Sequence, residues 1–169
     1  TWEKETLDLN AVEVPFLTSW VIAYDYGFAT MNDLSDTDKK IATIQDGFVK
    51  QILEADEIVI SAPLWNFSLT AILKAYFDLI LKANDTFKME DWNFVGLATN
   101  VKKAYIVLTK WGFYKWQAWE SIDMIESIIR QDLNFIGITN IEIIVLEWTN
   151  RLDEETLDEL RVPHTVDGW

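Results

Sequence analysis

Apolar residues follow two different spacings along this chain. Short continuous apolar runs at 57–61, 103–108 and 141–146 are typical of strands buried on both faces, as in a parallel sheet. Over 38–54 and 118–134, apolar residues instead recur every three or four positions, which predicts amphipathic helices. Strands that alternate with helices predict an α/β domain built on a parallel sheet.

Capping residues indicate where these helices begin and end. Ser35 is the expected cap of the first helix, and Asp38 places negative charge in its first turn, where the helix dipole favours it. Ser68 is the expected cap of another helix, which runs to about Ala83 with an apolar stripe facing inward. Gly137 stands just past the last long helix, as a helix-ending residue often does.

Other segments give weaker patterns. Residues 3–9 alternate and predict a short strand, while 86–89 and 94–97 predict a small hairpin-like excursion. Residues 153–161 predict a short acidic helix. No linker, repeat or change of composition divides residues 1–169, so we expect a single domain.

Composition excludes several kinds of chemistry. The formal net charge of −14 repels phosphate backbones and anionic lipid heads, so nucleic acid is not an expected partner. The chain has no Cys and one His, His164, which we expect to be a surface residue; thiolate catalysis, a metal site and a Ser-His-Asp triad are therefore not expected. We find no membrane-spanning run and no signal peptide, so we expect no membrane partner and a cytoplasmic location.

Two loops leave the ends of predicted strands, where ligands bind in open α/β sheets. The first is Ala62–Ser68 and the second is Thr109–Tyr114. Each combines flat apolar side chains with amide or hydroxyl groups. An isoalloxazine ring needs apolar faces above and below and hydrogen bonds along its pyrimidine edge, so the two loops predict a flavin site. Isolated aromatics more often serve a core or an interface, and this alternative applies to most of the aromatic residues here.

The first loop and the helix after it carry a longer pattern. It runs from Pro63 to Leu69, continues with Ala71 and Leu73–Tyr76, and ends with Thr86–Lys88. The pattern resembles the FMN-dependent NADH:quinone oxidoreductases, the azoreductase family, with their Pro-Met-Trp/Tyr-Asn-Phe-Ser loop, Leu-Lys-Ala-Tyr helix and Thr-Phe-Lys-Tyr segment. Asn134–Thr139 is similar to the family's Gly-Phe-Ile-Gly-Ile-Thr. The resemblance covers nearly the whole chain in order and spacing.

The resemblance implies a flavodoxin-like fold, a doubly wound parallel sheet in three layers, with FMN bound non-covalently. It implies that Asn66 hydrogen-bonds the ring, while the residue's own chemistry also allows it simply to cap the following helix or to satisfy a turn. Lys110 is open to a second interpretation as a solvated loop charge. The residues implied to contact FMN are Pro63, Leu64, Trp65, Asn66, Phe67, Thr109, Lys110, Trp111, Gly112 and Phe113.

Two of the departures of this chain from the family pattern bear most on the flavin site. Trp111 stands where the family has Gly, which implies a changed loop if that Gly needs positive φ or close backbone approach. The family also begins with a strand and a Ser-rich loop that holds the FMN phosphate. That strand is central in the flavodoxin-like order. The resemblance therefore implies about 20–35 further residues in front of Thr1, the length of one strand–helix unit.

The resemblance implies an enzyme that passes hydride from NADH or NADPH to FMN and then two electrons to a quinone or an azo compound, in a ping-pong scheme. The flavin carries this chemistry, so no catalytic side chain is expected. Family members are homodimers with FMN at the interface. Two alternatives stay open: a flavodoxin-like binding or scaffold protein that has lost flavin, and an electron carrier whose acidic surface docks on basic partners.

Overall fold

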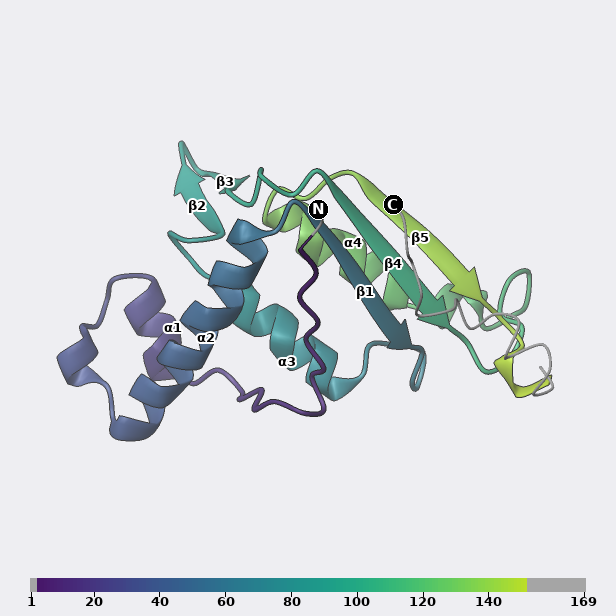
Figure 1. The fold of residues 1–169 in the computed structure, drawn as a ribbon, viewed down its shortest axis with the longest axis horizontal. Coiled ribbons are helices and arrows are strands. Elements are labelled where there is room, and N and C mark those ends of the chain that lie inside the picture. Colours follow the sequence, from purple (N-terminus) through teal and green to yellow (C-terminus); the bar gives the residue numbers. More distant parts are fainter. Residues whose placement is uncertain (1–2, 152–169) are drawn as a thin grey trace.

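A parallel sheet with the strand order β1-β4-β5 is the centre of the fold (Figure 1). The computed structural model describes residues 3–151. Its strands β1 (Glu57–Pro63), β4 (Lys103–Thr109) and β5 (Ile141–Leu146) are those that the apolar runs predict. Pro63 of β1 pairs with Thr109 of β4, and Thr109 is level with Leu146 of β5. The three strands therefore end side by side, and the predicted α/β architecture is confirmed.

The caps decide where the helices begin. Helix α2 (Asp36–Glu54) begins after Ser35, as predicted, and the Ser35 hydroxyl accepts a hydrogen bond from the Asp38 N–H at 3.1 Å. Helix α3 (Ala71–Ile80) begins later than predicted, because Thr70 caps it and Ser68 does not. Ser68 instead closes a tight turn by exchanging backbone hydrogen bonds with Trp65.

The remaining elements lie before, between and after the strands of the parallel sheet. The predicted hairpin is present as β2 (Phe87–Glu90) paired antiparallel with β3 (Asn93–Gly96). The predicted long helix before β5 is shorter than expected. The other helices are α1 (Ser19–Asp25), η1 (Met31–Asp33), η2 (Glu120–Ile122), α4 (Ile125–Phe135) and η3 (Thr149–Arg151).

The strand predicted over residues 3–9 is wrong. This segment has no strand conformation and pairs with no other segment that the structure describes, because alternation alone does not make a strand without a neighbouring strand to pair with. The helix predicted over residues 153–161 and the surface position predicted for His164 both lie outside the described residues.

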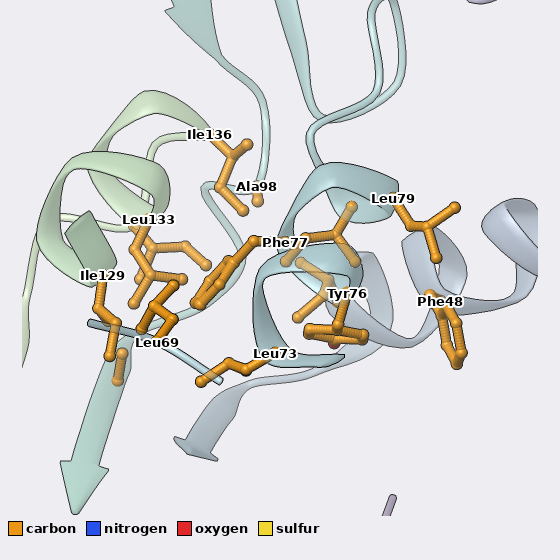
Figure 2. Close-up of a cluster of buried hydrophobic side chains, with 14 of the residues drawn as sticks. Phe48, Leu69, Leu73, Tyr76, Phe77, Leu79, Ala98, Ile129, Leu133 and Ile136 are labelled. Atoms are coloured by element: carbon orange, nitrogen blue, oxygen red, sulfur yellow. The ribbon is translucent and has the colours of Figure 1, made fainter. Parts of the chain in front are cut away.

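The core lies between the sheet and the helices. Ala104, Ile106 and Leu108 of β4 point into it and are buried. Figure 2 shows Phe77 of α3 at the centre of the cluster, with Leu133 of α4 beside it. Burying such a side chain contributes about 1.5–3 kcal/mol.

The two faces of the sheet differ. Helices α3 and α4 pack on the face of Ile106. On the other face, Val59 of β1 is 69% exposed and Ile144 of β5 is 43% exposed. Within residues 3–151 the helices thus cover one side of the sheet, and the other side remains open, with apolar residues exposed among polar ones. None of the helices in this part of the chain is long and apolar enough to cross a membrane.

A buried carboxyl joins α1 to α2. Asp25 Oδ2 accepts a hydrogen bond from Gln45 Nε2 at 3.0 Å, whereas Asp25 Oδ1 and Gln45 Oε1 have no hydrogen-bond partner among residues 3–151. Burial raises the pKa of Asp25 above its usual 3.8, although the Gln45 hydrogen bond and the charge of Lys82 act in the opposite direction.

We expect Asp25→Asn to raise the free energy of unfolding at pH 7 by about 1 kcal/mol. The raised pKa means that the folded protein holds this proton more tightly than the unfolded chain does. Its stabilising contribution is therefore present below the unfolded pKa and is lost as pH rises through the folded pKa. An amide needs no proton and supplies a donor beside Gln45 Oε1. Urea unfolding should show that Asp25→Asn has a higher free energy of unfolding than the parent at pH 7, and that this difference shrinks as pH falls toward 3.8. A lower free energy of unfolding at pH 7 would contradict this account.

Candidate functional site

The two predicted loops meet at the carboxyl end of the sheet. The Leu64 N–H donates to the Thr109 carbonyl at 2.8 Å, which joins the first residue after β1 to the end of β4. The rings of Phe67 and Tyr114 pack edge to face with centroids 5.9 Å apart. The sequence-based prediction that these loops leave the same edge of the sheet is therefore confirmed.

The first loop is a tight turn at Asn66 and Phe67. Both residues have positive φ, at 48° and 63°, and the turn is closed by hydrogen bonds between Trp65 and Ser68. Two successive positive φ values define a type I′ turn. Asn tolerates this region, but Phe rarely adopts it, so the surrounding structure holds Phe67 in a strained conformation. Strain of this kind is typical of functional sites.

The side chains of this turn divide by exposure. Leu64 is buried beneath the loop, whereas Trp65 is 63% exposed and Phe67 lies at the surface. Asn66 is exposed at the tip. The Phe67 carbonyl accepts a hydrogen bond from the Met124 N–H at 2.9 Å, which fixes the turn to the start of α4. The turn thus presents a flat aromatic surface and an amide on a rigid support.

The second loop is held by the segment after β5. The Lys110 carbonyl accepts hydrogen bonds from the Thr149 N–H at 3.2 Å and the Thr149 hydroxyl at 3.1 Å. The Tyr114 N–H donates to Glu147 Oε1 at 3.2 Å. Sequence reasoning missed this supporting segment. The third strand of a parallel sheet ends at the same edge as the other two, and that signal could have located it.

Trp111 stands where the family has Gly, but it does not force the loop into a strained backbone conformation. Positive φ in the neighbouring segments falls on Trp116 and Trp148, and neither Trp111 nor Gly112 adopts it. The Trp111 side chain points outward and is 70% exposed. A bulky residue is therefore accommodated here without a left-handed backbone.

Lys110 is buried, so its interpretation as a solvated loop charge is wrong. Its ammonium lies 2.6 Å from Asp123 Oδ2 and 3.1 Å from Glu126 Oε1. Burial lowers the pKa of Lys110, but the hydrogen bonds and charges of the two carboxylates outweigh it, so the pKa lies above its ordinary value. The ammonium stays charged and ties the second loop to the start of α4.

The two loops carry backbone N–H groups that are free to donate hydrogen bonds to a ligand. Among the described residues, the N–H groups of Asn66, Phe67, Trp111, Gly112 and Phe113 have no hydrogen-bond partner within the chain. These donors occur in two groups, one on each loop. An isoalloxazine ring carries acceptors along its pyrimidine edge, so these donors and the exposed aromatic faces fit a flavin. No group of carboxylates within residues 3–151 could hold a metal ion.

These features define a flavodoxin-like α/β domain with a candidate flavin site at the carboxyl ends of its strands. A family model described as the flavodoxin-like fold matches residues 2–162, and the chain belongs to that family.

Several known proteins are similar to this chain in sequence and in structure. The chain is 38% identical over 112 residues to an FMN-dependent NADH:quinone oxidoreductase of Beijerinckia indica, a match that covers 66% of this chain and 55% of the relative. It is 30% identical to FMN-dependent NADH:quinone oxidoreductase 3 of Bacillus cereus, over 88% of this chain and 71% of the relative.

A solved azoreductase from Bacillus anthracis superposes with a TM-score of 0.78 at 28% identity, covering 90% of this chain and 73% of that one. The chain spans between half and three fifths of the length of the first curated relatives that it matches.

Proposed function

We propose that this chain forms the flavin-binding part of an FMN-dependent oxidoreductase that reduces quinones or azo compounds with NADH or NADPH. The observation that carries the proposal is the pair of neighbouring loops beyond β1 and β4, which carry unpaired N–H groups and exposed aromatic rings. The names of the related proteins agree with it. FMN, when bound, supplies two-electron transfer between the nicotinamide and the acceptor.

The residues of the chain would then bind and orient. The first loop, supported from below by the buried Leu64, would place Asn66 at the hydrogen-bonding edge of the ring system. The second loop, from Thr109 to Phe113, would donate from its free N–H groups to the other side of that edge. Trp65 and Phe67 would exclude water and present aromatic surface to flat substrates. Because nicotinamide and acceptor would use one exposed face in turn, we expect ping-pong kinetics.

We further propose that the working protein is a cytoplasmic homodimer. Exposed aromatic residues around the hairpin support an interface, since Trp92 is 94% exposed and Phe94 is 54% exposed. Large exposed apolar patches mark interaction surfaces more often than free surface.

The deciding experiment is a titration of the full-length protein with FMN, followed by tryptophan fluorescence. We expect quenching, because Trp65 and Trp111 lie on the two loops that would enclose the ring. NADH oxidation coupled to quinone reduction should follow in the FMN-loaded protein. Absence of quenching would leave the scaffold alternative; binding without steady turnover would leave the electron carrier.

Asn66→Gly tests the first loop directly. Glycine keeps the positive φ of the turn and removes only the amide side chain. We expect the Kd for FMN to rise about fivefold, which corresponds to the loss of one hydrogen bond worth about 1 kcal/mol. The matched control is Asn140→Gly, which removes one side-chain hydrogen bond to Lys102 at the opposite end of the sheet. An equal effect of both variants on FMN affinity would exclude the proposed contact.

A further inference from the structure

Exposed indole rings gather beyond the carboxyl ends of the strands. Five of the nine Trp residues of the chain lie on the segments there, and each is between 42% and 77% exposed: Trp65, Trp111, Trp116, Trp119 and Trp148. Rings that served the core would be buried, so packing does not explain them. The proposed FMN contacts include Trp65 and Trp111, which leaves three rings without an assigned role.

These three rings are joined to one another through Phe113. The centroid of the Phe113 ring lies 6.1 Å from that of Trp116 and 5.9 Å from that of Trp148. The indole N–H of Trp119 donates to the Phe113 carbonyl at 3.2 Å. We call these four residues the Trp cluster. Because Phe113 belongs to the second of the two candidate flavin loops, the Trp cluster borders the proposed flavin site.

The backbone holds two of the rings in a strained conformation. Trp116 has a φ of 60° and Trp148 a φ of 62°, in the left-handed region that bulky residues rarely adopt. The Trp116 N–H donates to Glu120 Oε2 at 2.7 Å, and the Trp148 N–H donates to the Gly112 carbonyl at 3.2 Å. These hydrogen bonds hold both rings at the surface against the strain, which is typical of functional sites.

The charged groups around the Trp cluster favour a cation. Glu120 and Glu147 both accept hydrogen bonds from backbone N–H groups within or just after the second loop. The buried Lys110 is paired with carboxylates of its own. The ammonium of Lys115 lies 5.0 Å from the centroid of the Trp116 ring, in a cation–π contact. A face of the cluster thus already accepts a positive charge, and Lys115 is exposed and can give up its place.

We propose that the Trp cluster is a recognition surface for planar aromatic cations, beside the flavin site of the proposed function. Flat ligands stack on the rings, and a positive charge on the ligand adds attraction to the indole faces and to the carboxylates. Among quinone and azo acceptors, the site then selects those that carry a positive charge. Reduction of the bound acceptor rests on the proposed function, whereas its binding needs only the Trp cluster and its carboxylates.

Two matched azobenzenes test the charge preference. One carries a para-trimethylammonium group and the other a para-sulfonate group, so the two share one ring system and differ in the sign of their charge. Each is titrated into the 169-residue protein without NADH, so that no reduction takes place, and quenching of tryptophan fluorescence gives the Kd. We expect the cation to bind about tenfold more tightly, and added salt to reduce this difference. Equal Kd values would overturn the proposal.

Trp116→Gly locates the binding surface. Glycine keeps the positive φ and removes only the ring. We expect the Kd for the cationic azobenzene to rise about fivefold. The matched control is Trp20→Ala, which removes an exposed indole ring from α1 and should leave this Kd unchanged. An unchanged Kd in Trp116→Gly, or an equal rise in both variants, would place the dye elsewhere and overturn the proposal.

Two charge variants distinguish recognition from a merely structural role. Lys115→Met removes the cation that lies over Trp116, so the cationic azobenzene should bind about threefold more tightly. Glu120→Gln keeps an oxygen that can accept the Trp116 N–H and removes the negative charge, so this dye should bind about threefold more weakly. Loss of loop structure would weaken binding in both variants, and that result would overturn the proposal.

Turnover separates this inference from the proposed function. In the FMN-loaded protein with NADH, the two azobenzenes differ in intrinsic reducibility, so the deciding value is the change in their kcat/KM ratio caused by Trp116→Gly. We expect the preference for the cation to fall about fivefold. Turnover with an unchanged ratio would uphold the proposed function and overturn this inference. Failure of FMN to bind, with the expected pattern of Kd values, would overturn the proposed function and uphold the recognition surface.

Sedimentation of Trp116→Gly tests the other possible occupant of these rings, a second copy of the chain. We expect the oligomeric state of the variant to match that of the parent. If the variant instead loses a dimer while the Kd for the cationic azobenzene stays the same, the ring belongs to a subunit interface and the proposal fails.

Discussion

Gly96→Ala should lower the free energy of unfolding by about 3 kcal/mol or more, the upper range for overpacking in a rigid site. A Cβ atom at this position would lie 2.1 Å from the Gly137 nitrogen and 2.3 Å from the Ile136 carbonyl carbon. These are backbone atoms and cannot rotate away. They are also held in place, because the Ala98 N–H donates to the Ile136 carbonyl at 2.8 Å. The end of β3 would have to separate from the end of α4.

The matched control is Gly47→Ala in the interior of α2. Nothing lies within 4 Å of a Cβ atom at Gly47, so the methyl group meets open space. Alanine in a helix is about 0.5–1 kcal/mol more favourable than glycine, and this variant should therefore be more stable than the parent. Urea unfolding of both variants measures the contrast. A Gly96→Ala protein within about 1 kcal/mol of the parent would show that the close approach of the two backbones is not maintained in solution.

Periodicity was sufficient to predict the elements whose burial is decided locally. The runs around Ile58, Ile106 and Ile143 predict a parallel sheet, and all three form it. The expected burial on both faces is wrong for the described residues, because Val59 and Ile144 are exposed on one face. The Ser35 cap worked for the same reason, because its hydrogen bond reaches only three residues along the chain. The edge at which the two loops meet followed from the topology of parallel sheets.

Features that depend on distant partners could not be predicted in this way. Residues 3–9 alternate like a strand but find no ladder beside them. The left-handed Phe67 is set by the closing hydrogen bonds of its turn and by Met124, which lies far along the chain. The burial of Lys110 depends on Asp123 and Glu126, and no spacing rule connects these residues across an irregular loop.

Lys110→Met should lower the free energy of unfolding by about 3 kcal/mol, because it leaves the buried Asp123 carboxylate without its cation. The side chains of Lys110 and Asp123 are only 6% and 8% exposed. Glu126 is more exposed and can be solvated. The matched control is Lys50→Met, which breaks the surface pair with Glu54; both of these side chains are largely exposed, so the cost should be below about 1 kcal/mol.

A double variant separates the ion pair from simple packing. Lys110→Met combined with Asp123→Leu removes both charges, and replacing a buried pair with apolar groups is often neutral. We therefore expect the double variant to recover most of the stability that Lys110→Met loses. If it is instead as unstable as the sum of the two single variants, the charges are not coupled and the 2.6 Å contact does not persist in solution.

The same residues decide how Lys110 would act on the proposed FMN site. An ammonium that contacts FMN directly should bind it at least as well when Asp123→Asn frees it from one carboxylate. If the ammonium instead positions the loop, its ion pair with Asp123 is needed for that role. FMN binding should then weaken in Asp123→Asn as well as in Lys110→Met. Because the Lys110 carbonyl is held by Thr149 and its side chain by α4, we expect positioning, with weaker FMN binding in both variants. Titration of each variant with FMN, under conditions where both remain folded, measures the difference; an unchanged affinity in Asp123→Asn would favour direct contact.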